Sequence, residues 1–248
     1  MGVIIFGGVS SRDFGVIVEN YPAINHGALR GEGYQIAGRN GTFYSDDFTV
    51  DNYVQAYNIA IIEKNRGAAG RCADLTAWLM APSAYTSFQR LEDSFEPEYY
   101  KWARYAGPLN IEQILGRYGR CTLEFECRPE RWLKSGEIPV TVSSTAITLH
   151  NPTKYKAKPL IRVVRTGDTD IKIGNDKFMT ITGYSTASTI YIDCADGTIK
   201  TGSGTNLYNL ATFFHTYNDF PTLAPEADTT ITCTNATEIT VTPRWYVL

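Results

Sequence analysis

The side chains in this sequence best suited to acid–base chemistry are three pairs of neighbouring carboxylates, Glu92–Asp93, Glu96–Glu98 and Glu124–Glu126. Glycoside hydrolases use two carboxyl groups that flank the scissile bond. On a strand, residues two apart share one face at a separation of roughly 7 Å, which suits Glu124 and Glu126. Any solvated strand face has the same spacing, so we interpret Glu124 and Glu126 as residues of such a face and none of the three pairs as catalytic. A glycan hydrolase is kept only as a minor alternative.

The three histidines, His26, His150 and His215, lie far from any nucleophile motif. The sequence has no GxSxG, HExxH or GxxxxGK(S/T) pattern, and no GxGxxG that opens a helix after a strand. Asp168-Thr169-Asp170 and Asn175-Asp176 could offer oxygen ligands to Ca²⁺, but the EF-hand spacing is missing and turn chemistry explains them. We therefore predict no catalytic residues, no cofactor and no metal site, and we expect that the protein is not an enzyme.

The five cysteines are scattered, odd in number and never arranged as CxxC: Cys72, Cys121, Cys127, Cys194 and Cys233. Buried cysteines commonly behave as small hydrophobic residues. This usage argues against a disulfide framework and a zinc site, and it favours folding in a reducing cytoplasm.

Composition places the chain among soluble globular proteins. Of 248 residues, 43% are hydrophobic and 20% charged, which supplies enough apolar material for a core. The formal net charge is −3 and no block of Lys and Arg appears, which argues against a phosphate-binding surface. The longest apolar stretch, residues 75–81, is too short to span a bilayer, so we expect no membrane insertion.

The hydrophobic pattern predicts a mainly β protein. Apolar residues alternate with polar ones from Cys121 to Cys127, at Ile138, Val140 and Val142, and from Ile190 to Cys194. This period of two predicts strands with one buried face. Asp196–Gly197 and Asn175–Asp176 predict hairpin turns, and Gly38-Arg39-Asn40-Gly41 predicts a third, because Asn and Gly adopt positive φ at low cost.

One helix is predicted over residues 70–80, where Cys72, Leu75 and Leu79 share a face and Pro82 follows. Further strands are expected over 86–91, 99–105 and 111–115. Polar, turn-rich residues after Cys127 predict a domain boundary, with domains over 1–130 and 137–248 and a linker over 131–136. The short Thr- and Ile-rich segments of the second domain predict a β-sandwich or jelly roll.

The order of several segments resembles the distal tail proteins of siphophages, the Dit family. In the first half these segments are Ser10-Ser11-Arg12-Asp13-Phe14-Gly15-Val16, the turn at 38–41, the helix near 75–80, Glu96-Pro97-Glu98-Tyr99-Tyr100 and Phe125-Glu126-Cys127-Arg128-Pro129. In the second half they are Asn151-Pro152, Ile192-Asp193, Asn218-Asp219-Phe220-Pro221-Thr222-Leu223 and Val241-Thr242-Pro243-Arg244-Trp245. The resemblance covers nearly the whole chain and depends on the shared order of the segments.

The resemblance implies a β-rich N-terminal domain, with one helix and a long hairpin, that closes into a homohexameric ring. It also implies a galectin-like β-sandwich as the C-terminal domain. The family's ring sits at the tail tip of the virion, between the major tail (tube) protein and the tail-tip Tal protein. Its central channel passes DNA, and in some members the outer domain anchors a receptor-binding protein. Such a protein is assembled in the bacterial host cytoplasm.

A carbohydrate-binding adsorption module is the alternative from a different functional class. Tyrosines stack on sugar rings when they gather on one open face. The second half offers four candidates for sugar contact: Tyr184, Tyr191, Tyr208 and Tyr217.

Overall fold

The fold was analysed in a computed structural model, which describes residues 2–62, 67–81, 87–115, 118–183, 185, 188–215 and 219–248. The chain forms two compact units. The N-terminal unit comprises Met1–Arg131 with Leu248, and the C-terminal unit comprises Trp132–Val247. Residues 131–136, predicted as a linker, form the end of a long strand and most of a 3-10 helix, η2 (Lys134–Glu137).

A nine-stranded sheet organises the N-terminal unit, in the order β2-β1-β7-β8-β10-β6-β3 with β9 and β21 also paired to β10. The strands are β1 (Ile4–Phe6), β2 (Val9–Ser10), β3 (Val16–Val18), β6 (Tyr53–Ile62), β7 (Gln89–Asp93), β8 (Tyr99–Tyr105), β9 (Glu112–Leu115), β10 (Tyr118–Leu133) and β21 (Tyr246–Val247). The last two residues of β10 belong to the C-terminal unit, where the Leu133 amide donates to the Trp245 carbonyl over 2.9 Å.

The predicted alternation in residues 121–127 is confirmed within β10. Leu123, Phe125 and Cys127 are fully buried, and β10 pairs antiparallel with β6 along ten residues, with Leu123 opposite Tyr57. We call the face that carries these buried residues the inner face and the opposite one the outer face. On the inner face Phe125 packs against Phe6 at a ring-centroid distance of 5.1 Å, so apolar burial holds this half of the sheet together.

The single predicted helix is confirmed as α1 (Gly67–Leu79), slightly longer at its start than expected. Leu75 and Leu79 are buried in the same core as the inner face of the sheet. Trp78 stacks on Phe14, from the 3-10 helix η1 (Ser11–Phe14), with ring centroids 4.9 Å apart. Pro82, expected to close the helix, lies outside the described residues, as does Thr86 at the start of a predicted strand.

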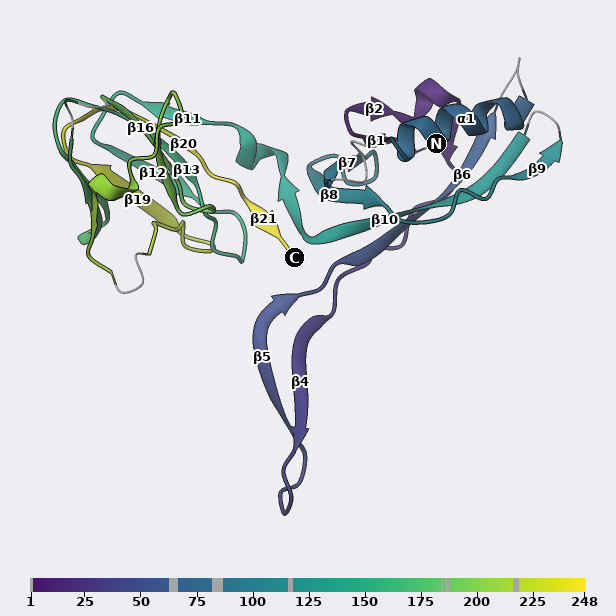
Figure 1. Cartoon of the computed structure of the whole chain (residues 1–248), viewed down its shortest axis with the longest axis horizontal. Coiled ribbons are helices and arrows are strands. Elements are labelled where there is room, and N and C mark those ends of the chain that lie inside the picture. Colours follow the sequence, from purple (N-terminus) through teal and green to yellow (C-terminus); the bar gives the residue numbers. More distant parts are fainter. Residues whose placement is uncertain are drawn as a thin grey trace. The chain divides into compact units, whose positions relative to one another are not determined.

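A separate two-stranded ribbon joins β3 to β6 and extends away from the nine-stranded sheet (Figure 1). It is formed by β4 (Leu29–Gln35) and β5 (Thr42–Val50), and all seven residues of β4 are exposed. The loop between them contains the predicted turn, with positive φ at Gly38 and Gly41. At the base of the ribbon the Asp51 amide donates to the Ala28 carbonyl over 2.8 Å.

The C-terminal unit is a β-sandwich of two five-stranded antiparallel sheets among the residues described. One sheet has the order β11-β20-β13-β16-β17, with β11 (Val140–Val142), β13 (Leu160–Arg165), β16 (Thr189–Asp193), β17 (Thr198–Thr201) and β20 (Ala236–Thr242). The other has the order β12-β19-β14-β15-β18, with β12 (Ala146–His150), β14 (Thr169–Ile173), β15 (Asp176–Ile181), β18 (Ala211–Phe213) and β19 (Asp228–Cys233). Both sheets contribute to one core, so the predicted mainly β fold is confirmed.

The two hairpins predicted in this unit are confirmed. β14 pairs with β15 around Gly174 and Asn175, and β16 pairs with β17 around Asp196 and Gly197. The buried face predicted for Ile138, Val140 and Val142 is wrong for its first two residues: Ile138 is 64% exposed and Val140 is 40% exposed. Ile138 precedes β11, and β11 is a three-residue edge strand with a neighbour on one side only, so alternation there does not produce burial.

Candidate assembly surfaces

Exposed large apolar side chains are unevenly divided between the two units. Of the fifteen recorded among the described residues, twelve lie in the N-terminal unit. These twelve are Ile5, Val9, Tyr21, Ile24, Leu29, Tyr34, Ile36, Phe43, Val54, Ile62, Ile114 and Tyr118. The three in the C-terminal unit are Ile138, Val140 and Phe214. Contiguous exposed apolar patches commonly mark sites of protein association, so the N-terminal unit offers the stronger candidate surfaces.

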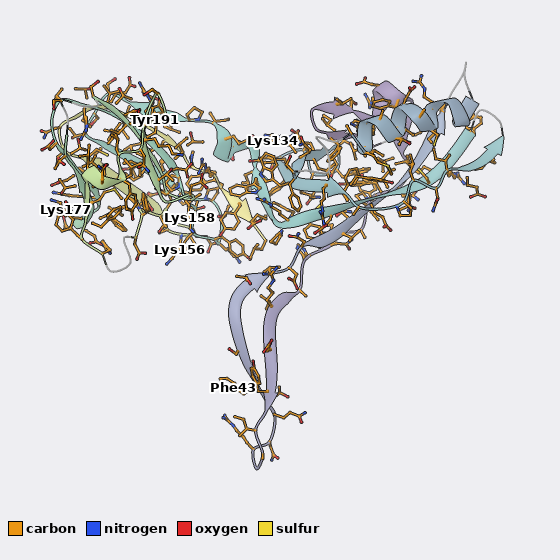
Figure 2. The ribbon with its side chains drawn as sticks, viewed as in Figure 1. Phe43, Lys134, Lys156, Lys158, Lys177 and Tyr191 are labelled. Atoms are coloured by element: carbon orange, nitrogen blue, oxygen red, sulfur yellow. The ribbon has the colours of Figure 1, made fainter. Side chains whose placement is uncertain are left out.

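The tip of the ribbon is the first candidate surface, and we define it by Tyr34, Ile36, Arg39 and Phe43. The three apolar side chains are 48%, 48% and 53% exposed, respectively. The side chain of Phe43 stands on the ribbon close to its turn (Figure 2). Arg39 is also exposed, and no ion pair of its guanidinium is recorded within the described part of the chain. The tip therefore combines apolar area with a cation.

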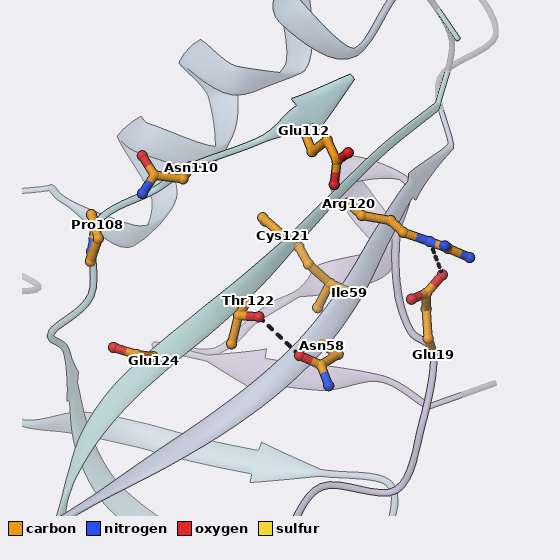
Figure 3. A pocket seen from close by; sticks show the side chains of 10 residues that line it. All are labelled: Glu19, Asn58, Ile59, Pro108, Asn110, Glu112, Arg120, Cys121, Thr122 and Glu124. Atoms are coloured by element: carbon orange, nitrogen blue, oxygen red, sulfur yellow. Dashed lines mark hydrogen bonds and ion pairs between the residues drawn. The ribbon is translucent and has the colours of Figure 1, made fainter. Parts of the chain in front are cut away.

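A shallow groove on the outer face of the nine-stranded sheet is the second candidate surface. Its volume is about 570 Å³. It is lined by Glu19, Asn58, Ile59, Pro108, Asn110, Glu112, Arg120, Cys121, Thr122 and Glu124 (Figure 3). We call it the β6–β10 groove. Short side chains form its floor, where the Thr122 hydroxyl donates to Asn58 Oδ1 over 2.9 Å.

The residues that line the β6–β10 groove carry more negative than positive charge. Arg120 Nε donates to Glu19 Oε1 over 2.8 Å, which neutralises one carboxylate. The side chains of Glu112 and Glu124 have no hydrogen-bond or ion-pair partner recorded in the ranges that the structure describes. With one cation against three carboxylates, the groove is acidic.

A second, more apolar hollow of about 380 Å³ adjoins the groove and shares Glu19 and Arg120 with it. Its apolar wall is formed by Ile17, Ala60, Ile62, Ile114 and Tyr118. Ile62, Ile114 and Tyr118 are 38%, 49% and 47% exposed. The outer face thus presents an acidic groove beside an apolar patch.

The carboxylates that could serve acid–base chemistry are mostly engaged in structural contacts. Glu126 accepts hydrogen bonds from Asn52 Nδ2 at 2.8 Å and from Arg104 Nε at 2.6 Å, and these contacts lower its pKa. Glu92 is ion-paired with Arg90 at 2.5 Å. A carboxylate held ionised in this way is a poor general acid.

The second predicted pair, Glu96–Glu98, is likewise divided between a structural contact and solvent. Glu96 contacts Lys101 at 2.9 Å and Arg131 at 2.7 Å, whereas Glu98 is exposed. Asp93 is buried and accepts the Tyr57 hydroxyl at 2.8 Å and the Phe95 amide at 2.9 Å. These carboxylates join β7 and the loop after it to β6, β8 and β10.

The histidines and the acidic turn residues also make local contacts. His150 Nδ1 lies 2.7 Å from Asp228, on an exposed edge, and His215 lies 3.1 Å from Asp176 and stacks on the Phe178 ring. The pKa of Asp170 is lowered, first by a hydrogen bond from Lys177 at 2.8 Å. Among the described residues no group of three or more His, Cys, Asp or Glu side chains is arranged to hold a metal ion.

Two of the four tyrosines predicted for sugar contact can be placed. Tyr191 on β16 lies opposite Arg162 in the sheet (Figure 2). Tyr208 packs against Phe213 and Phe220 at ring-centroid distances of 5.1 and 6.5 Å. The two rings thus belong to different contact groups. Tyr184 and Tyr217 lie outside the described residues.

All five cysteines are free thiols, and three of them are buried. Burial raises the pKa of Cys121 to about 11 and the pKa of Cys127 and Cys233 to about 12. Burial also raises the pKa of Cys194. These thiols are therefore protonated at neutral pH. In the part of the chain that the structure describes, no helix has the length and apolar character needed to cross a bilayer.

Comparison with known proteins gives a similarity to a solved structure. No protein-family model matches the sequence, and no curated protein matches it either. Among solved structures, the chain is similar to the Dit protein (gp 19.1) of phage SPP1, described as a paradigm of hub adsorption apparatus in phages that infect Gram-positive bacteria. The TM-score is 0.75 at 15% sequence identity, and the match covers 100% of both chains. The chain therefore has a Dit-like fold along its whole length.

Proposed function

We propose that this protein is a structural hub component of a phage tail tip, a distal tail protein whose copies join into a ring. The proposal extends to this chain the role of hub adsorption apparatus described for the SPP1 protein, whose fold it shares over its full length. The proposed role is not catalytic, in keeping with carboxylates that are engaged in ion pairs.

The observation that carries this proposal is the exposed ribbon formed by β4 and β5. A two-stranded hairpin is at best marginally stable alone in water, because it has no sheet or helix to pack on. Among the described residues no further strand pairs with either of its edges, and Phe43 and Tyr34 are about half exposed. Contact with a neighbouring molecule satisfies the edges and covers the apolar rings.

The arrangement of such contacts follows from symmetry. A ribbon on one molecule that contacts a different surface on the next molecule forms a head-to-tail interface, and repeated head-to-tail contacts close into a ring. We propose six copies, the number that the family resemblance implies, around a channel that passes DNA. The net charge of −3 supports the channel, because a basic lining would bind phosphates and slow passage.

The proposed ring joins the tail tube protein on one side to the tail-tip Tal protein on the other, at the distal end of the virion tail. The C-terminal β-sandwich is proposed to serve as the outer attachment domain for a receptor-binding protein. Direct sugar binding by this domain is a weaker proposal, because Tyr191 and Tyr208 make contacts with different partners.

Light scattering combined with negative-stain electron microscopy tests the proposal. Six copies of 27.6 kDa give a particle of about 166 kDa, and images should show a ring with a central channel. Co-expression with the adjacent tail proteins tests whether the ring closes only when a partner protein is present. A protein that stays monomeric at high concentration, alone and after co-expression, would refute the ring.

A further inference from the structure

We infer that the ribbon tip of one copy binds in the β6–β10 groove of a second copy, where Arg39 pairs with Glu112 and Glu124. Ile36 and Phe43 then pack on the apolar patch formed by Ile62, Ile114 and Tyr118. This inference rests on the proposed function, because it names the two surfaces that meet in the assembly.

The first argument is that the ribbon is not covered by its own chain. Every residue of β4 is exposed, and Phe43 on β5 is 53% exposed. The loop of the ribbon is well formed, because Gly38 and Gly41 adopt positive φ and the Arg39 amide donates to the Ile36 carbonyl at 3.1 Å. The tip is therefore a well-defined protrusion whose apolar side chains are exposed.

The second argument is that the outer face of the sheet contains a recess with a defined floor and sides. Between the segment at Pro108–Asn110 and the side chain of Glu19, the floor consists of Asn58 and Thr122, which are short. The recess above this floor has a volume of about 570 Å³ (Figure 3). Proteins commonly bind a projecting segment of a partner in a surface groove.

The third argument is that the two surfaces match in charge and in apolar character. Glu112 and Glu124 are the unbalanced charges of the groove, and Arg39 is the cation of the tip. Arg binds carboxylates through a planar fork of donors, and such pairs fix the register of an interface. The apolar residues of the tip, Ile36 and Phe43, correspond to the apolar patch beside the groove, 38–49% exposed. A second copy of the chain supplies both properties at once.

A charge exchange tests the pairing in the full-length protein. Arg39→Glu places an anion on the tip, and Glu112→Arg with Glu124→Gln places a cation in the groove. The affinity between copies of each variant alone should be at least about tenfold lower than that of the wild type, because like charges meet at every contact. An equimolar mixture should recover assembly, and its particles should contain the two variants in alternation, hence in equal numbers, by native mass spectrometry.

Matched controls reverse the same charges elsewhere in the N-terminal unit. Arg12→Glu and Glu98→Arg change exposed residues outside both surfaces and should leave assembly unchanged. Equal weakening by the controls would show that net charge, not the Arg39 pairing, governs assembly, and would overturn the inference. Failure of the mixture to recover assembly would overturn it as well.

Photocrosslinking gives a readout that does not require a closed ring. A benzophenone amino acid at position 43 should crosslink to a second chain at Ile62 or within residues 112–122, and Arg39→Glu should reduce the yield about tenfold. Crosslinks to the ribbon of another copy, or to the C-terminal unit, would overturn the inference. Rings with crosslinks elsewhere would refute this pairing but not the hub. Crosslinks at Ile62 or at 112–122 without rings would support the pairing and refute the hub.

Discussion

The two units of this chain differ in how many of their large apolar residues they leave exposed to solvent. The C-terminal unit places its apolar residues between two five-stranded sheets, and three large ones remain exposed among its described residues. The N-terminal unit buries one face of its sheet beneath α1, yet it leaves twelve large apolar residues exposed on the outer face, on the ribbon and elsewhere. A sequence of average composition can thus contain one unit that buries most of its large apolar residues and one that leaves many of them exposed.

The edges of the sheets show the same contrast. In the C-terminal unit the edge strands are three to five residues long, and a threonine pair connects each of β11 and β12 to the next strand. Thr141 is 2.9 Å from Thr240 across the β11–β20 pair, and Thr148 is 2.8 Å from Thr230 across the β12–β19 pair. Short, polar edges resist pairing with other chains. The two strands of the ribbon, seven and nine residues long, pair with no further strand in the part of the chain that the structure describes, which favours association.

The largest expected effect comes from removal of the ribbon. Replacing residues 29–50 with a short Gly-Ser turn should abolish assembly, because apolar anchors at interfaces contribute about 2 kcal/mol each. The hydrogen bond between Ala28 and Asp51 holds the two ends close enough to be joined. Calorimetry should show unfolding temperatures within about 2 °C of the wild type. A large loss of thermal stability would mean that the ribbon belongs to the fold of the N-terminal unit.

The next effect concerns the interior of the C-terminal unit. Arg165 is 1% exposed and donates to the carbonyls of Ile181 at 2.6 Å and Thr182 at 3.1 Å. Arg165→Ala should destabilise this unit by about 3 kcal/mol, because it leaves a cavity and two carbonyls without this donor. Urea unfolding followed by hydrogen exchange of β13 and β15 measures this. Arg162→Ala, which removes a surface ion pair with Glu238, should cost less than about 1 kcal/mol.

A smaller effect is expected at Asp193. Its two carboxylate oxygens accept hydrogen bonds from Arg244 Nη1 at 2.7 Å and Arg244 Nη2 at 2.8 Å. Burial alone would raise the pKa of Asp193, but hydrogen bonds from Arg244 and from the Asp196 amide outweigh it and lower the pKa. Because the pKa of Asp193 is lower in the folded state, its ionised carboxylate stabilises the folded protein at any pH above the ordinary carboxyl pKa of about 4. This stabilisation is lost as the pH falls through the pKa of Asp193 in the folded protein. Asp193→Asn should cost about 2 kcal/mol at pH 7 and less in acid.

Unfolding temperatures measured between about pH 2.5 and pH 7 test this dependence. The difference between the wild type and Asp193→Asn should shrink as the pH falls below about 4. Asp228→Asn is the matched control, because Asp228 pairs with His150 on an exposed edge. A difference that stays constant with pH would show that Asp193 does not stabilise the unit through its charge.

The smallest effect is expected at the exposed residue Ile138. Ile138→Thr should change the stability of the C-terminal unit by less than about 0.5 kcal/mol, because the side chain is 64% exposed. Ile192→Ala, at a fully buried position in the same sandwich, should cost about 3 kcal/mol. Comparable losses at both positions would mean that the alternation at 138–142 marks a buried face after all.

The sequence predicts some elements of this fold well because their burial is regular. Residues 99–105 were predicted as a strand, and β8 has those bounds, while the alternation at 121–127 identifies the inner face of β10. The same rule fails at Ile138 and Val140, because alternation reports only that one face is apolar. Whether that face is covered depends on the position of the strand in its sheet.

The β6–β10 groove could not be predicted, because residues far apart in the sequence form it. Glu19 and Arg120 are separated by 101 positions and meet only through the register of β3, β6 and β10. One signal was present in the sequence. The outward positions of β6 are Val54, Ala56, Asn58, Ala60 and Ile62, and four of these five residues are apolar on a face that would otherwise be polar.

The protonated thiols have a consequence for durability. Oxidation by dissolved oxygen and by peroxides proceeds through the thiolate, so a thiol whose pKa is near 12 reacts very slowly at neutral pH. Cys127 and Cys233 are in this state, and neither is exposed. We therefore expect these two side chains to resist oxidation in air-saturated water at neutral pH, because burial keeps both of them in the thiol form.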